Sequence, residues 1–136
     1  MKKIMIAVLL ILLSAGVGCW WFRPSSGEAP TLPKIREIQE IQMTDSSGAV
    51  VHLDMEEKIT SFIYFTKDSH KTRQESINDQ PSSDLSPYQF DLKLKNGTVR
   101  LYIYQKGWKT YLESPYVGIY ELDHSLSDWL SGKLDY

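Results

Sequence analysis

Hydrophobic and polar positions alternate most regularly between Tyr88 and Leu122, where they predict three antiparallel strands joined by short turns. Asn96-Gly97 is typical of a type I′ hairpin, because both residue types tolerate positive φ. Lys106-Gly107 is expected to form the second turn, which would put Leu101 opposite Leu112. A two-residue turn at Asn96-Gly97 pairs Lys95 with Thr98 and so fixes the register. On one face Leu94 then lies opposite Val99, Leu92 opposite Leu101, and Phe90 opposite Ile103.

The opposite face of these strands is rich in tyrosine and in charged residues. An exposed aromatic face with polar tips is typical of protein-binding surfaces. Two alternatives stay open: strands favour tyrosine in any setting, or the N-terminal tether or a C-terminal helix covers this face. The candidate binding face consists of Arg100, Tyr102, Tyr104, Tyr111 and Glu113.

Before this region, the pattern predicts two strands between Lys34 and Asp54, joined by a turn at residues 46–48. A helix is expected to follow, capped by Asp54 with Glu57 in a capping box and ending near Lys67. Its apolar stripe should pack across the sheet. The stripe consists of Met55, Ile59, Phe62, Ile63 and Thr66.

A short second helix is expected within Ser125–Lys133, with Ser125 as its cap and Leu126, Trp129 and Leu130 as its buried side. The sequence therefore predicts one α+β domain over residues 34–136. We expect an antiparallel sheet of four to six strands, one main helix on one face, and a short C-terminal helix.

The N-terminus has the organisation of an export signal, with lysines at positions 2 and 3 and an aliphatic run from Ile4 to Leu13. Small residues then precede Cys19, which resembles the lipobox of bacterial lipoproteins, where the thiol takes a diacylglycerol. The alternative is an uncleaved anchor, because residues 4–22 are nearly long enough to span a bilayer. We predict a signal at residues 1–19, a Pro/Ser-rich tether at 20–33, and a domain on the extracytoplasmic side of the cell membrane.

Charge and composition exclude some classes of partner. The 136-residue chain carries a formal net charge of −2, about −4 once Lys2 and Lys3 are removed, and it has no basic stripe. A phosphate-rich partner would be repelled, so we predict no nucleic-acid binding. Cys19 is the sole cysteine, which excludes a disulfide within the domain.

No residue pattern predicts catalysis. His52, His70 and His124 lack the spacing of metal ligands, so we expect surface histidines and no metal or other cofactor. No serine lies in a Gly-x-Ser-x-Gly turn, and Cys19 is assigned to the lipid or the anchor. The sequence therefore predicts a protein that is not an enzyme.

Two segments carry a resemblance to a known family. The chain reads Thr-x-x-Glu-Ser-Ile-Asn-Asp-x-Pro over Thr72–Pro81 and Pro-Tyr-x-Gly-Ile-Tyr over Pro115–Tyr120. Together they resemble a family of small uncharacterised lipoproteins from Gram-positive bacteria, over roughly Ile35 to Leu122. The resemblance implies export and a single α+β domain, and it assigns no catalytic residue.

These observations favour an exported, membrane-anchored, non-catalytic interaction protein of unknown ligand. Its expected contacts are the membrane, through the Cys19 lipid or the N-terminal helix, and a protein or wall component. Two alternatives remain open: an immunity-type or inhibitory lipoprotein acting outside the membrane, and an accessory subunit of a membrane protein.

Overall fold

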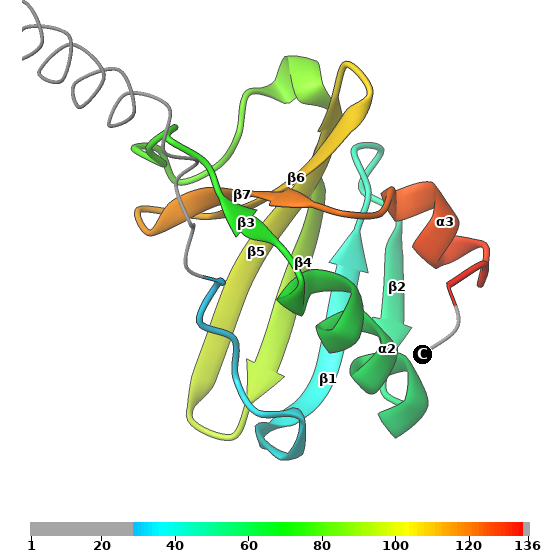
Figure 1. Ribbon diagram of the computed structural model, residues 1–136. Helices are drawn as coiled ribbons and strands as arrows, with labels where there is room; N and C mark the ends of the chain where they lie inside the picture. Colours follow the sequence, from blue (N-terminus) through cyan, green and yellow to red (C-terminus); the bar gives the residue numbers. More distant parts are fainter. Residues whose placement is uncertain (1–28, 135–136) are drawn as a thin grey trace, which may run out of the picture.

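The computed structural model describes residues 29–134, which form a seven-stranded antiparallel sheet with two α-helices (Figure 1). The predicted signal, Cys19 and most of the tether lie outside the described residues. The elements are, in chain order, η1 (Ile35–Glu37), β1 (Ile38–Thr44), β2 (Val50–Leu53), α2 (Glu56–Lys67), β3 (His70–Lys71), η2 (Ser83–Leu85), β4 (Tyr88–Leu94), β5 (Gly97–Lys106), β6 (Lys109–Ser114), β7 (Gly118–Leu122) and α3 (Leu126–Leu130).

The strand order is β2-β1-β4-β5-β6-β7-β3, so the predicted count of four to six strands is too small. Two strands were not predicted. β3 has two residues, too few to produce an alternating pattern, and residues 88–122 form four strands, β4 to β7, instead of the three predicted. After β2 the chain passes through α2 to reach β3 at the opposite edge, and residues 72–87 then return to β4. The molecule is mostly β, with a sheet larger than the sequence predicts.

One face of the sheet, called the core face here, packs against α2 and α3. Phe62 of α2 stacks on Phe90 of β4 with ring centroids 4.7 Å apart. Trp129 of α3 stacks on Phe65 at 5.5 Å, and its indole N–H donates to Ser61 Oγ at 2.8 Å. The strand residues of this core are Ile38, Ile41, Met43, Phe90, Leu92, Leu101, Ile103, Leu112, Tyr120 and Leu122.

The predicted register is wrong by two residues. Phe90 lies opposite Leu101, and Leu94 lies opposite Gly97, so the turn residues are Lys95 and Asn96. Neither of them has a positive φ, which excludes the type I′ turn. Because side chains alternate with a period of two, this shift leaves every residue on its predicted face.

The second hairpin is shifted in the same way. Lys106 pairs with Lys109, and the turn consists of Gly107 and Trp108. Gly107 has a φ of 66°, a left-handed value at the first turn position that favours glycine. As a result Leu112 lies opposite Ile103 instead of Leu101.

The predicted helix cap at Asp54 is wrong. The N-cap is Met55, which has an extended backbone and no side-chain cap, because Asp54 precedes the helix by one residue too many. The helix ends at Lys67, as the sequence predicts. In α3 the predicted cap is confirmed, since Ser125 Oγ accepts from the Asp128 amide at 3.1 Å, but Leu130 is exposed instead of buried.

The last residues of the predicted tether belong to the folded domain. Pro30 is buried, and Leu32 packs against the core cluster. The domain therefore begins before Lys34, because these residues supply apolar surface that the sheet can cover. Within residues 29–134 no helix combines the length and the hydropathy that crossing a bilayer requires.

Candidate interaction surface

The predicted binding face lies opposite the core face and is called the polar face here. Tyr102, Tyr104 and Glu113 are buried on it, so the expectation of an exposed tyrosine face is wrong. Residues 72–87 lie against this face, on the way from β3 to β4 (Figure 1). The C-terminal helix α3 does not cover this face, because its Trp129 packs on the core face, and Leu32, a described residue of the predicted tether, packs against the core cluster as well. Tyr111 is partly buried, while Arg100 is exposed.

A buried carboxylate fixes the covering segment to the sheet. Glu113 Oε1 accepts from the Ser76 hydroxyl at 2.7 Å, and Oε2 accepts from the Tyr104 hydroxyl at 3.3 Å. Ser76 Oγ in turn accepts from the Tyr116 amide at 3.2 Å. Burial, together with the negative charge of Glu113, raises the pKa of Tyr104, so this phenol remains a protonated donor.

A second buried carboxylate lies on the polar face of β4. Asp91 accepts two hydrogen bonds from the Arg100 guanidinium, at 2.7 and 3.1 Å, and one from Gln89 at 2.9 Å. Burial alone would raise the pKa of Asp91, but the bonds from Arg100 and Gln89 outweigh burial and lower it. Asp91 is therefore an ion-paired structural carboxylate, and its oxygens are already occupied.

The two segments that carry the family resemblance lie side by side at the β7–β3 edge. The amide and the hydroxyl of Thr72 both donate to the Ile119 carbonyl, each at 2.8 Å. The Tyr116 hydroxyl donates to Asp79 Oδ1 at 2.7 Å, and Tyr116 itself has a φ of 61°. A non-glycine residue in this conformation is uncommon, and here hydrogen bonds at both ends of Tyr116 hold it.

Three large apolar side chains project from this junction into solvent. Ile77 is 69% exposed, Tyr116 65% and Val117 58%, and we call these three residues the motif surface. They stand on irregular backbone that Ser76 and Asp79 tie to the β6–β7 turn. The sequence does not predict this surface, because the exposure of the three side chains depends on hydrogen bonds between residues that lie 37 and 40 positions apart in the chain.

Trp108 provides a second exposed apolar position, at the opposite end of β6. It is 85% exposed in the β5–β6 turn, beside the Lys109 ammonium. No other large apolar side chain is exposed in the described hairpin of β5 and β6, residues 97–114. Trp108 therefore resembles an isolated surface residue more than a patch.

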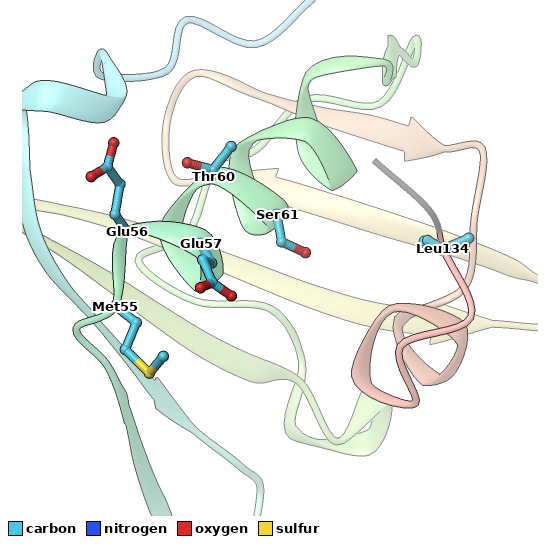
Figure 2. A pocket seen from close by; sticks show the side chains of 6 residues that line it. All are labelled: Met55, Glu56, Glu57, Thr60, Ser61 and Leu134. Carbon is cyan, nitrogen blue, oxygen red and sulfur yellow. The ribbon is translucent and has the colours of Figure 1, made fainter.

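A hollow of about 740 Å³ lies at the start of α2 (Figure 2). Glu56 and Glu57 occupy the first helical turn, where carboxylates complement the helix dipole. Ser61 Oγ already accepts from Trp129, so it is engaged in packing α3. This lining favours a solvated acidic groove and holds no pair of groups arranged for proton transfer. The lining residues are Met55, Glu56, Glu57, Thr60, Ser61 and Leu134.

The three histidines do not come together. His52 is hydrogen-bonded to Glu40, His70 Nε2 lies 3.5 Å from Asp123 Oδ1, and His124 is exposed. Among residues 29–134, no group of three or more His, Cys, Asp or Glu side chains is close enough to hold a metal ion.

Comparison with known proteins adds a family and a fold. Residues 26–121 match the model of the family DUF5301, whose description reads "Domain of unknown function (DUF5300)". The chain is also similar to a solved structure described as "NMR structure of the protein from Ruminococcus gnavus", with 26% identity and a TM-score of 0.64. That similarity covers 74% of this chain and 97% of the other. No curated protein matches the sequence.

Proposed function

Because the chain belongs to the family DUF5301, whose description assigns no activity, we propose its function from its own surface. The protein is an exported, membrane-anchored, non-catalytic interaction protein that binds a protein partner through the motif surface. The N-terminal pattern supports export, since an aliphatic run and small residues precede Cys19. The motif surface of Ile77, Tyr116 and Val117 supports binding.

The motif surface combines exposed apolar side chains with a backbone that hydrogen bonds hold in place, and this combination supports binding most strongly. Ile and Val side chains stabilise a protein when they are removed from water, so exposed ones add nothing to the stability of the loop. Yet the buried Glu113 carboxylate and the Ser76 hydroxyl hold the backbone that presents them. Rigid apolar and aromatic anchors lower the entropic cost of association, which is why interfaces concentrate binding energy on such residues.

The partner is best sought with the full-length protein in its native membranes. We would capture the tagged chain after mild cross-linking and compare it with the double variant Ile77→Ser/Val117→Ser. The double variant should reduce capture about tenfold or more, because anchors of this kind contribute above ~1 kcal/mol each. Tyr116 is left in place so that its hydrogen bonds to Ser76 and Asp79 persist.

Trp108→Ser is the matched control, because Trp108 is also exposed and apolar but lies at the other end of β6. It should leave capture unchanged. Equal capture by all three proteins would contradict the motif surface as the binding site. Failure of the wild type to capture any protein would contradict the interaction function itself.

The proposed membrane anchor can be tested separately, by measuring the mass of the mature protein. We propose that Cys19 carries a diacylglycerol, which follows from its place after the apolar run and the small residues. Intact-mass analysis of the membrane form should then give a chain that begins at a lipid-modified Cys19. A chain that still begins at Met1 would establish the spanning helix instead.

A further inference from the structure

Strand β2 is the outer edge of the sheet, next to β1. The opposite edge, β3, has two residues, whereas β2 has four, Val50–Leu53. An edge strand presents backbone N–H and C=O groups to solvent on its outer side, which allows another strand to pair with it. Figure 1 shows β2 at the outer edge of the sheet, next to β1.

The pairing of β1 with β2 shows which residues direct these groups outward. The Asp45 amide donates to the Ala49 carbonyl at 3.0 Å, so Asp45 and Ala49 form a hydrogen-bonded pair. Such pairs alternate along an antiparallel ladder, which makes Met43 and Val51 the next one. The backbone groups of Val50 and His52 must then face away from β1.

Apart from its short length of four residues, β2 lacks the usual protections of an edge strand. Natural edges carry lysine, proline, a bulge or a covering segment. Residues 50–53 contain no proline and no lysine, and Val50 and Val51 are 45% and 46% exposed. The His52 ring is hydrogen-bonded to Glu40 of β1, so it is drawn toward its own sheet.

We propose that β2 pairs with β2 of a second copy of this chain, antiparallel and around a two-fold axis at Val51. Val50 then lies opposite His52 of the second copy, so that the outward backbone groups of both residues find partners. Val51 lies opposite its own counterpart, as an isologous interface requires. No Lys, Arg, Asp or Glu lies within β2, and Asp54 falls opposite Gly48, so identical strands meet without opposed like charges.

Cross-linking through a single cysteine tests this register in the full-length chain. In a Cys19→Ser background, Val51→Cys places two thiols on a non-hydrogen-bonded pair, whose Cα atoms lie about 4.5 Å apart. That separation falls within the range of about 4.4–6.8 Å that disulfides span. The detergent-solubilised protein should therefore form a disulfide-linked dimer about tenfold faster, or more, than Val117→Cys in the same background. Val117 is the matched control, since it is an exposed valine at another edge of the molecule.

A charge at the same position tests the association without a covalent bond. Val51→Lys should convert a concentration-dependent dimer into a monomer in sedimentation experiments, because it opposes two ammonium groups. Circular dichroism should show the fold unchanged, since Val51 is half exposed. Equal cross-linking rates for positions 51 and 117, or a wild-type chain that stays monomeric at every concentration, would overturn the proposal.

Discussion

The core face and the polar face of the sheet differ in what covers them and in how the cover is held. On the core face, α2 and α3 contribute aromatic rings, and Phe62, Phe90 and Trp129 contact one another directly. On the polar face, an irregular segment is held by hydrogen bonds to Glu113. Both covers bury part of the sheet, but the cover of the polar face depends more on individual donors and acceptors.

The core face and the polar face therefore have different roles: the first stabilises the fold, and the second positions the loop that carries Ile77. Apolar burial is roughly proportional to area and lacks direction, so the core face stabilises the fold without positioning any particular loop. Hydrogen bonds are directional, and a buried carboxylate tolerates few arrangements of its donors. The polar face can therefore hold residues 72–80 in one conformation that leaves Ile77 outside.

The largest loss of unfolding free energy is expected for a substitution on the core face. Leu101→Asp places a charge in a fully apolar site, and the domain should lose more than about 4 kcal/mol of unfolding free energy. Circular dichroism and denaturant titration would register the loss of the folded state. Leu130→Asp is the control, because Leu130 is exposed and should tolerate the charge. A folded Leu101→Asp protein would show that the faces are assigned the wrong way round.

The next largest loss of stability is expected when the ion pair between Arg100 and Asp91 on the polar face is broken. Arg100→Ala leaves the buried Asp91 carboxylate without its main partner and should cost about 2 kcal/mol at neutral pH. Because the folded-state pKa of Asp91 lies below 3.8, its contribution is present above that pH and is lost as the pH falls through the lowered value. Without Arg100 the pKa rises, so acid unfolding followed by tryptophan fluorescence should begin at a higher pH. An unchanged acid midpoint would show that the pair contributes nothing.

A smaller effect is expected at the hydroxyl that joins the covering segment to the sheet. Ser76→Ala removes one of the two hydroxyl donors of Glu113 and should lower the free energy of unfolding by about 1–2 kcal/mol. Ser82→Ala in the same segment is the control, since Ser82 is exposed and makes no side-chain cap. Equal stabilities of the two variants in urea titrations would contradict a structural role for the Ser76 bond.

The smallest effect on stability is expected at the motif surface. Ile77→Ser/Val117→Ser should change the free energy of unfolding by no more than about 0.5 kcal/mol, because both side chains already face solvent. Thermal unfolding would measure this. A large loss of stability would mean that these side chains pack within the domain and are not available to a partner.

The sequence predicts correctly which strand residues lie on each face, because a register error of two residues leaves every side chain on the same face. Leu101 and Ile103 lie on the core face in both registers. The register itself depends on which residues make each turn, and the local preference of Asn96-Gly97 was overridden by the pairing of the neighbouring strands. In the second hairpin the left-handed Gly107 is the first turn residue instead of the second.

The cover of the polar face could not be predicted from pattern alone. Residues 72–87 have no period, and their contacts to Glu113 and Ile119 join positions far apart in the sequence. Tyrosine on a strand indicates a half-polar environment, which suits an exposed face and a hydrogen-bonded buried face equally. The sequence places Tyr104 and Glu113 on one face of the sheet, as the structure does, but it does not predict that the two side chains share a hydrogen bond or that Ser76 covers them.

Hydrogen exchange at the Tyr116 amide tests most directly whether the polar face holds the motif surface in place. Tyr116 lies in an exposed turn, yet its N–H donates to Ser76 Oγ. We expect slow exchange of this amide in the wild type and fast exchange in Ser76→Ala, with core amides such as Leu101 slow in both proteins. Fast exchange at Tyr116 in the wild type, beside slow core amides, would contradict the claim that this surface is held rigid.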